Sequence, residues 1–88
     1  MSAEELTAKY ILAMEKVLSQ IQKTKGPITI SEECINEVFN YVHSYLADAK
    51  YFQSQKKHET SLVSIAYCEG LLDALKLIGA AKNFPPLK

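Results

Sequence analysis

The sequence predicts an all-α fold, a three-helix up-and-down bundle in which neighbouring helices are antiparallel. Apolar residues recur at spacings of three and four in three separate stretches, which is the periodicity of amphipathic helices. No segment has the partnered β-branched runs that a sheet requires. The chain has 88 residues, of which 48% are hydrophobic, so it can bury one small core. We expect a single domain over residues 1–82, with helices at about 3–24, 32–55 and 58–81, and then a proline-containing tail over residues 83–88.

The first expected helix carries its apolar residues on one side, and only Leu12 falls outside. The members of this stripe are Leu6, Tyr10, Met14, Val17, Leu18 and Ile21. Gly26 and Pro27 then stop the helix, because Gly adopts the left-handed closing conformation and Pro cannot continue the hydrogen-bond ladder. Residues 28–30 form too short a β-branched run for a sheet, so we expect an extended linker there.

The start of the second expected helix has two readings. Ser31 can cap it, while Thr29 with Glu32 offers a competing capping box two residues earlier. The apolar residues of this helix again share one side: they are Ile35, Val38, Phe39, Val42, Leu46, Ala49 and Phe52, with Tyr41 and Tyr45 at the margin. The break at Lys56 and Lys57 is too short to do more than reverse the chain, so the second and third helices should be antiparallel neighbours.

The third expected helix is apolar over more than half of its circumference, unlike the first two. Such a helix needs partners on more than one side, and a second subunit or another protein would cover what the first two helices leave free. We name Leu71 and Ile78, with Phe84 and Leu87 in the tail, as the candidate interaction surface. The alternative for the two tail residues is that they fold back on the bundle. Gly70 in mid-helix costs about 1 kcal/mol relative to Ala, so we expect its missing side chain to admit close approach of another helix. The alternative is a glycine that is exposed and merely tolerated.

The charge composition argues against nucleic-acid and membrane partners. Ten basic residues balance ten acidic ones, and none of the basic residues is arginine, the usual bidentate phosphate ligand. No uncharged run approaches the roughly 18 residues of a membrane-spanning helix, and the first residues are acidic rather than signal-like, so we expect a cytoplasmic protein. Cys34 and Cys68 lack metal or redox spacing, and we expect both to be reduced, buried and inert.

No arrangement of residues in the sequence indicates catalysis. His43 and His58 have no Cys or His at ligand spacing. No serine lies in a glycine elbow, and no glycine-rich loop is present to hold phosphate. We therefore predict that the protein is not an enzyme and takes no metal and no cofactor.

Three carboxylates are the remaining candidates for a chemical site. Glu69 and Asp73 lie four residues apart, which puts two like charges on one helix face, and Asp48 lies at the edge of the second helix's apolar face. If they converged, they would form a cation site or an acid–base pair. The alternative, which we favour, is a solvated stripe in which Lys76 relieves the repulsion at Asp73, or an Asp73 that hydrogen-bonds a neighbouring tyrosine or a helix terminus.

A cluster of lysines supports an alternative function. Lys50, Lys56 and Lys57, with Tyr51 beside them, gather near one end of the expected bundle, where they could contact RNA or a nucleotide. Three lysines without arginine on a neutral chain are more often a solvated helix end. Nucleotide or RNA binding is therefore our second hypothesis, after a non-enzymatic protein-interaction module that homodimerises or docks on a protein partner.

One stretch of the sequence resembles a known family. The residues concerned are Asp48-Ala49-Lys50-Tyr51-Phe52 and, after a fixed interval, Tyr67, Gly70 and Leu72-Asp73-Ala74. They are similar to those of the archaeal proteins grouped as domain of unknown function 357. The resemblance implies a short archaeal three-helix protein with no established activity. It also implies an accessory role beside nucleotidyltransferase-type domains, which are the partners that the family association suggests.

The same resemblance selects candidate functional or packing positions: Asp48, Tyr67, Gly70 and Asp73, with Glu69 beside them. Lys56 and Lys57 stand where the family has a turn Gly and Asp. Leu71 stands in place of a Trp, and Glu69 in place of an aromatic residue or His, which weakens any family site built on those side chains. The hairpin is also faintly similar to the HEPN-type nucleotide-binding bundles, whose RNA-cutting members use an arginine that this chain lacks.

Overall fold

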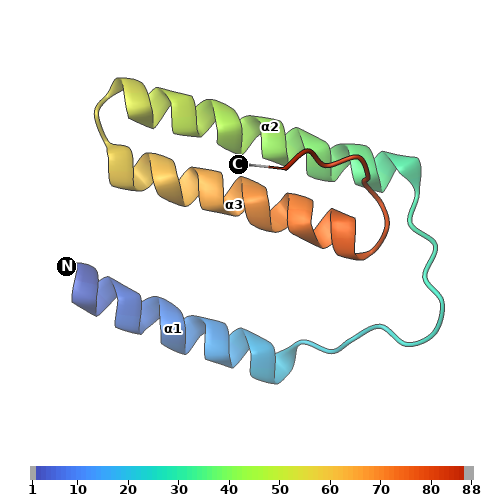
Figure 1. Cartoon of the computed structure of the whole chain (residues 1–88). Helices are drawn as coiled ribbons and strands as arrows, with labels where there is room; N and C mark the ends of the chain where they lie inside the picture. Colours follow the sequence, from blue (N-terminus) through green and yellow to red (C-terminus); the bar gives the residue numbers. More distant parts are fainter. Residues whose placement is uncertain (1, 87–88) are drawn as a thin grey trace.

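The computed structural model describes residues 2–86 and contains three α-helices and no β-strand in that range. They are α1 (Ala3–Gln20), α2 (Glu32–Ser54) and α3 (His58–Leu77), in this order along the chain (Figure 1). The predicted all-α, three-helix class is confirmed. The bounds of α2 agree with the prediction to one residue, whereas α1 ends at residue 20 rather than 24 and α3 at residue 77 rather than 81.

Serine side chains begin the first two helices. The Ser2 hydroxyl accepts a hydrogen bond of 3.1 Å from the backbone N–H of Glu5, and the Ser31 hydroxyl accepts one of 3.1 Å from that of Cys34. Each satisfies an amide of the first turn that has no partner inside the helix. Ser31 is therefore the cap of α2, and the competing start at Thr29 is wrong. α3 begins after Lys57, which makes no such side-chain bond.

Two helices end in the same left-handed motif. At the end of α3, Gly79 has a φ of 76°, its N–H donates to Lys76 O, and the N–H of Ala80 donates to Leu75 O over 2.8 Å. These are the paired bonds of a Schellman motif, which closes a helix through one left-handed residue. Gly79 is the reason why α3 stops four residues before the predicted end. The apolar residues that follow it made the helix look longer in the sequence.

The end of α2 repeats this geometry with a lysine in the left-handed position. Lys56 has a φ of 59°, its N–H donates to Gln53 O over 3.0 Å, and the N–H of Lys57 donates to Phe52 O over 2.8 Å. A side chain in this conformation is strained relative to glycine. The chain reverses here within three residues, so α2 and α3 form a hairpin.

The hairpin is held together by a narrow seam, which we define as Val42 and Ala49 of α2 with Cys68 and Leu75 of α3. These are the four buried apolar residues in the described range, and within each helix they are seven residues apart. A seven-residue repeat keeps one line of side chains facing a neighbouring helix. Half-buried residues flank the seam on both helices; they include Ile35, Val38, Tyr45, Phe52, Ile65, Leu71 and Leu72.

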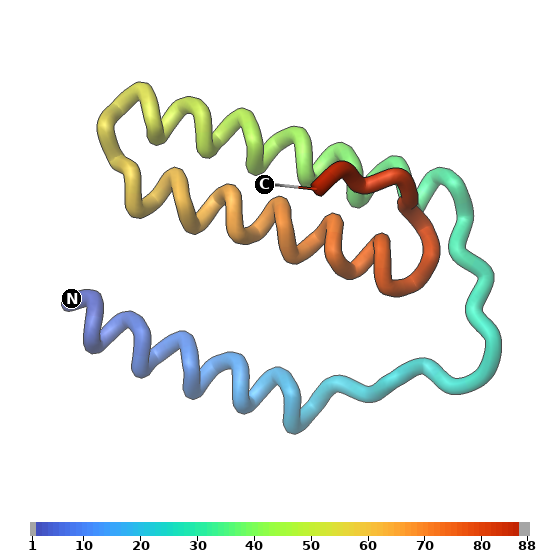
Figure 2. Tube along the Cα trace, viewed as in Figure 1, coloured from blue at the N-terminus to red at the C-terminus, as the bar shows by residue number. Residues whose placement is uncertain are grey.

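Helix α1 lies apart from the hairpin. It contributes no buried residue, and the only helix pair in contact is α2 with α3 among residues 2–86. Figure 2 shows α1 running alongside α3 without joining it, at the end of a long linker. The radius of gyration is 16.0 Å, whereas a compact chain of this length has about 12 Å. The sequence led us to expect one core shared by all three helices, and residues 2–86 of the single chain do not form such a core.

The C-terminal segment turns back over the hairpin after Gly79 (Figure 1). Phe84 is half-buried, and the Lys76 Nζ atom lies 5.4 Å from the centre of its ring. This distance is within the range of a cation–π contact. Phe84 thus covers one side of α3, and Leu87 lies outside the described residues. Within residues 2–86, no helix combines the length and the hydrophobicity needed to cross a lipid bilayer.

Candidate interaction surface

Two hydrogen bonds from side chains of α3 to the backbone of α2 set the register of the hairpin. Ser61 Oγ donates to Ala49 O over 2.7 Å, and Cys68 Sγ donates to Val42 O over 3.4 Å. Moving seven residues forward in α3 moves seven residues back in α2, so the two helices are antiparallel. Sequence reasoning missed these bonds. One feature of the sequence could have indicated them: Ala49, Ser61 and Cys68 are small, and Ser61 and Cys68 are seven residues apart on α3. Small residues at such positions let two helix backbones approach closely.

A pair of tyrosines closes one side of the seam. The rings of Tyr45 and Tyr67 have centroids 4.3 Å apart and planes tilted by 31°. The pKa of the Tyr45 phenol is raised above its ordinary value of 10.0, first by hydrogen bonding with the Tyr67 side chain and by the charge that Tyr67 acquires on ionisation. Burial, Tyr41 and Asp48 raise this pKa further. Tyr67 and Asp48, two of the predicted positions, therefore both lie around Tyr45.

One side of α3 is apolar and exposed, and it includes Tyr67, which also contacts Tyr45 at the edge of the seam. We call it the outer face and define it as Val63, Tyr67, Gly70, Ala74 and Leu77, all of which are exposed. Leu77 has 86% of its surface exposed. A shallow hollow of about 260 Å³ lies on this side, lined by Tyr67, Gly70 and Leu71. A Cβ atom added at Gly70 would meet no atom within 4 Å, so the helix expected to approach this glycine is not supplied by the described part of the chain.

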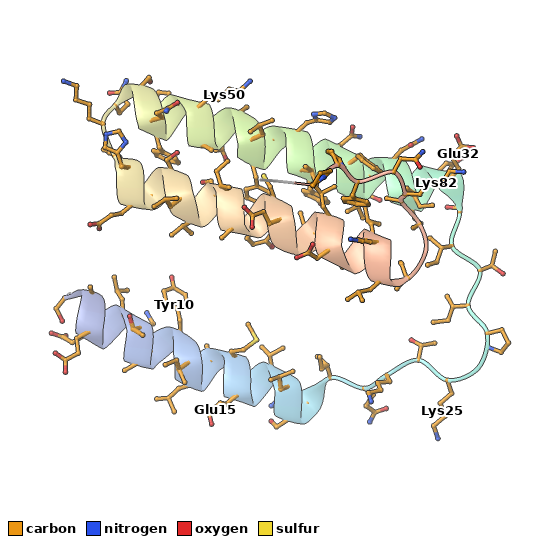
Figure 3. All side chains as sticks on the ribbon, viewed as in Figure 1. Tyr10, Glu15, Lys25, Glu32, Lys50 and Lys82 are labelled. Carbon is orange, nitrogen blue, oxygen red and sulfur yellow. The ribbon has the colours of Figure 1, made fainter. Side chains whose placement is uncertain are left out.

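Helix α1 carries a second uncovered apolar surface, the α1 stripe. Its members are exposed without exception: Leu6, Tyr10, Met14, Val17, Leu18 and Ile21. Figure 3 shows Tyr10 on the side of α1 that is turned toward α3, and Glu15 on the opposite side. The apolar stripe was predicted from the sequence, but its exposure was not. The hairpin buries no residue of α1.

The predicted carboxylates do not form a common site. Glu69 and Asp73 line a hollow of about 400 Å³ between α3 and the C-terminal segment, together with Lys76, Phe84 and others. Asp48 is on α2 and takes no part in this hollow. Among residues 2–86, no group of three or more His, Cys, Asp and Glu side chains is arranged to hold a metal ion. Glu69 and Asp73 are exposed, and the Nζ atom of Lys76 lies 5.4 Å from the centre of the Phe84 ring.

The lysines at the turn are only partly brought together. Lys56 and Lys57 line an open hollow of about 400 Å³ with His58, Glu59 and Thr60. Lys50 is not among the lining residues, and Figure 3 shows it on the side of α2 that is turned away from α3. A bound nucleic-acid strand would therefore contact two adjacent lysines and a nearby glutamate, and not a continuous row of basic side chains.

The remaining predicted residues have mixed positions. Leu71 is half-buried at the edge of the seam, whereas Ile78 is exposed just beyond the end of α3. Both cysteines are free thiols, and Cys68 is buried as expected. Cys34 is exposed, so the expectation that it is buried is wrong. The reason is its place in the first turn of α2, at the end of the hairpin where the seam has not begun.

Comparison with known proteins gives one match. The model of a family described as "Protein of unknown function (DUF357)" matches residues 9–81. No curated protein and no solved structure matches the chain. The matched range covers most of α1 and the whole hairpin, so α1 is part of the family's pattern.

Proposed function

We propose that this chain, which belongs to the DUF357 family of unknown function, is a non-enzymatic protein-interaction module. The observation that carries this proposal is the pair of uncovered apolar surfaces, the outer face of α3 and the α1 stripe. Monomeric proteins rarely leave large apolar patches in contact with water, and such patches typically mark interfaces. The family association adds nucleotidyltransferase-type domains as candidate partners.

The rigidity of the hairpin favours a binding role for the outer face. The seam and its two cross-helix hydrogen bonds fix α3 against α2, so the outer face is presented on a preformed helix. A partner that binds a preformed surface does not have to order it, which reduces the entropy lost on binding. Gly70 and Ala74 lower the middle of this face, which leaves room for larger apolar side chains of a partner.

Affinity capture with a tagged chain tests the proposal. We expect captured proteins to be lost when a carboxylate is placed in either apolar surface, by Val63→Glu on α3 or Met14→Glu on α1. Leu12→Glu is the matched control, because Leu12 is on α1 but outside the stripe. Each captured protein is then purified and titrated against the wild-type chain and these variants. Binding that is equal for all four chains, or no binding partner at all, would contradict the proposal.

Nucleotide or RNA binding is the alternative function, and the hollow beside Lys56 and Lys57 is what supports it. Binding through these residues would weaken with added salt, because cations displaced from phosphate are released. The test is RNA and nucleotide titration of the wild-type chain and of a chain with Lys50, Lys56 and Lys57 all changed to Gln. Salt-insensitive binding, or equal binding by both chains, would exclude this alternative.

A further inference from the structure

We infer that the outer face of α3 is covered by α1 of a second copy, so that two chains exchange their first helices. This inference rests on the proposed function and names the partner as the same protein. It follows from the area that the single chain leaves exposed, from the match between the two apolar surfaces, and from the linker that carries α1.

The exposed area of the single chain is that of an incomplete unit. The chain exposes 8073 Å², whereas a folded monomer of 9.9 kDa exposes about 5,200 Å². The excess is roughly 2,900 Å² per chain, and homodimers that do not exist as monomers bury about 2,000–5,000 Å² or more in total. An interface that covered this excess on both chains would therefore be as large as the interfaces of permanent dimers.

The α1 stripe and the outer face have matching patterns. Residues 10, 14, 17 and 21 of the stripe follow spacings of four, three and four, and residues 63, 67, 70, 74 and 77 of the outer face follow the same repeat. Two helices with this repeat can pack side by side along their length. The stripe has bulky side chains such as Met14, while the middle of the outer face has Gly70 and Ala74. Large residues on one helix thus meet small residues on the other.

The linker favours a second copy over the chain's own hairpin. Eleven residues separate the end of α1 from the start of α2, whereas helix connections in bundles usually have two to eight. Fully extended, they reach about 36 Å, which is comparable to the longest dimension of the chain, 43 Å. Between residues 22 and 30, no backbone N–H forms a hydrogen bond to another backbone group. α1 makes no contact with its own hairpin, and exchange of an identical element on such a hinge is a low-cost route to dimers.

Light scattering of the purified protein is the first test. We expect twice the chain mass, a dissociation constant raised at least tenfold by Met14→Glu, and no comparable change for Leu12→Glu. Circular dichroism of each variant shows whether its helices still form. A mass equal to one chain, or a dimer that Met14→Glu leaves intact, overturns the inference.

Cross-linking then distinguishes exchange of the α1 helices between two chains from a dimer whose chains lie side by side without exchanging α1. Ala13→Cys and Ala66→Cys are made in separate chains, both also carrying Cys34→Ser to remove the exposed thiol. These two positions lie near the middle of their helices, so a flexible bismaleimide can join them whichever way the helices run. We expect cross-linked heterodimers on mixing. A chain with both cysteines that cross-links only to itself overturns exchange.

The two failures can be told apart. If the purified protein is monomeric and hydrogen exchange finds α1 unprotected, the second copy is wrong, while capture of another protein through the same faces still upholds the proposed function. If the monomer protects α1, the helix has closed on its own hairpin, and the inference fails together with the surface that the proposed function requires.

Discussion

Ser61 Oγ in α3 donates a hydrogen bond of 2.7 Å to the backbone carbonyl of Ala49 in α2, across the seam of the hairpin. Ala49 is 97% buried, leaving 3% of its surface exposed. The carbonyl already accepts a bond within its own helix, so the serine supplies a second donor to an oxygen that has a free lone pair. The small size of Ala49 and Ser61 therefore lets the two helices approach closely at the point where this hydrogen bond joins them.

Removing the hydrogen bond from Ser61 to Ala49 should lower the free energy of unfolding of the hairpin by a small, measurable amount. Ser61→Ala loses one hydrogen bond without leaving the carbonyl unpaired, so we expect about 0.5–1.5 kcal/mol less stability in urea unfolding. Ser44→Ala is the matched control, because Ser44 is exposed on α2 and the same change of residue type occurs in a helix. Equal midpoints for the two variants would show that the bond contributes nothing.

Leu75 should be the most sensitive large residue of the seam. It is 4% exposed, so Leu75→Ala leaves a cavity between the helices, and such changes typically cost 2–5 kcal/mol. Leu62→Ala is the control on the same helix, since Leu62 is 67% exposed, and it should cost well under 1 kcal/mol. Thermal unfolding followed by circular dichroism checks this. A loss at Leu62 as large as that at Leu75 would place the core elsewhere.

The turn of the hairpin should be improved by glycine. Lys56→Gly removes a side chain from a left-handed position, with an expected gain of about 1 kcal/mol in the free energy of unfolding. Lys56→Ala is the control, because it removes the charge but keeps the Cβ atom, and we expect no such gain. Calorimetry of the three chains makes the comparison. If alanine stabilises as much as glycine, the charge rather than the backbone conformation is responsible.

Local rules of helix formation predicted most of this fold. The apolar periods located all three helices, and Ser31 was one of two caps considered for α2. Gly79 was missed because apolar residues continue beyond it, and a single glycine within such a run gives no sign of its φ. The sequence also led us to expect a shared core, because a stripe like that of α1 indicates that a helix will be covered but not by which surface.

The candidate site was harder to predict, because it depends on which residues of different helices meet. Tyr67 and Gly70, predicted as functional or packing positions, are both exposed on α3. The ring that contacts Tyr67 belongs to Tyr45, which the sequence placed only at a margin. Asp48, Glu69 and Asp73 share a charge type but not a location, since one lies on α2 and two face the C-terminal segment. Spacing within a helix cannot reveal such distances.

The Tyr45 phenol should retain its proton above pH 10.0 in the folded protein, and Tyr67→Phe should bring its pKa down toward that value. The phenylalanine keeps the ring contact but removes the hydroxyl and the charge that it can carry. Because folding raises the pKa of Tyr45, the protonated phenol stabilises the folded protein. This contribution to the free energy of unfolding is fully present below pH 10.0 and is lost as the pH rises through the pKa of Tyr45 in the folded protein. Stability should therefore fall with rising pH in this alkaline range, and less steeply in the variant. NMR titration with labelled tyrosine follows Tyr45 directly, and Tyr10→Phe, on the separate α1, is the control. A Tyr45 pKa that is the same in Tyr67→Phe and wild type would show that Tyr67 is not the cause.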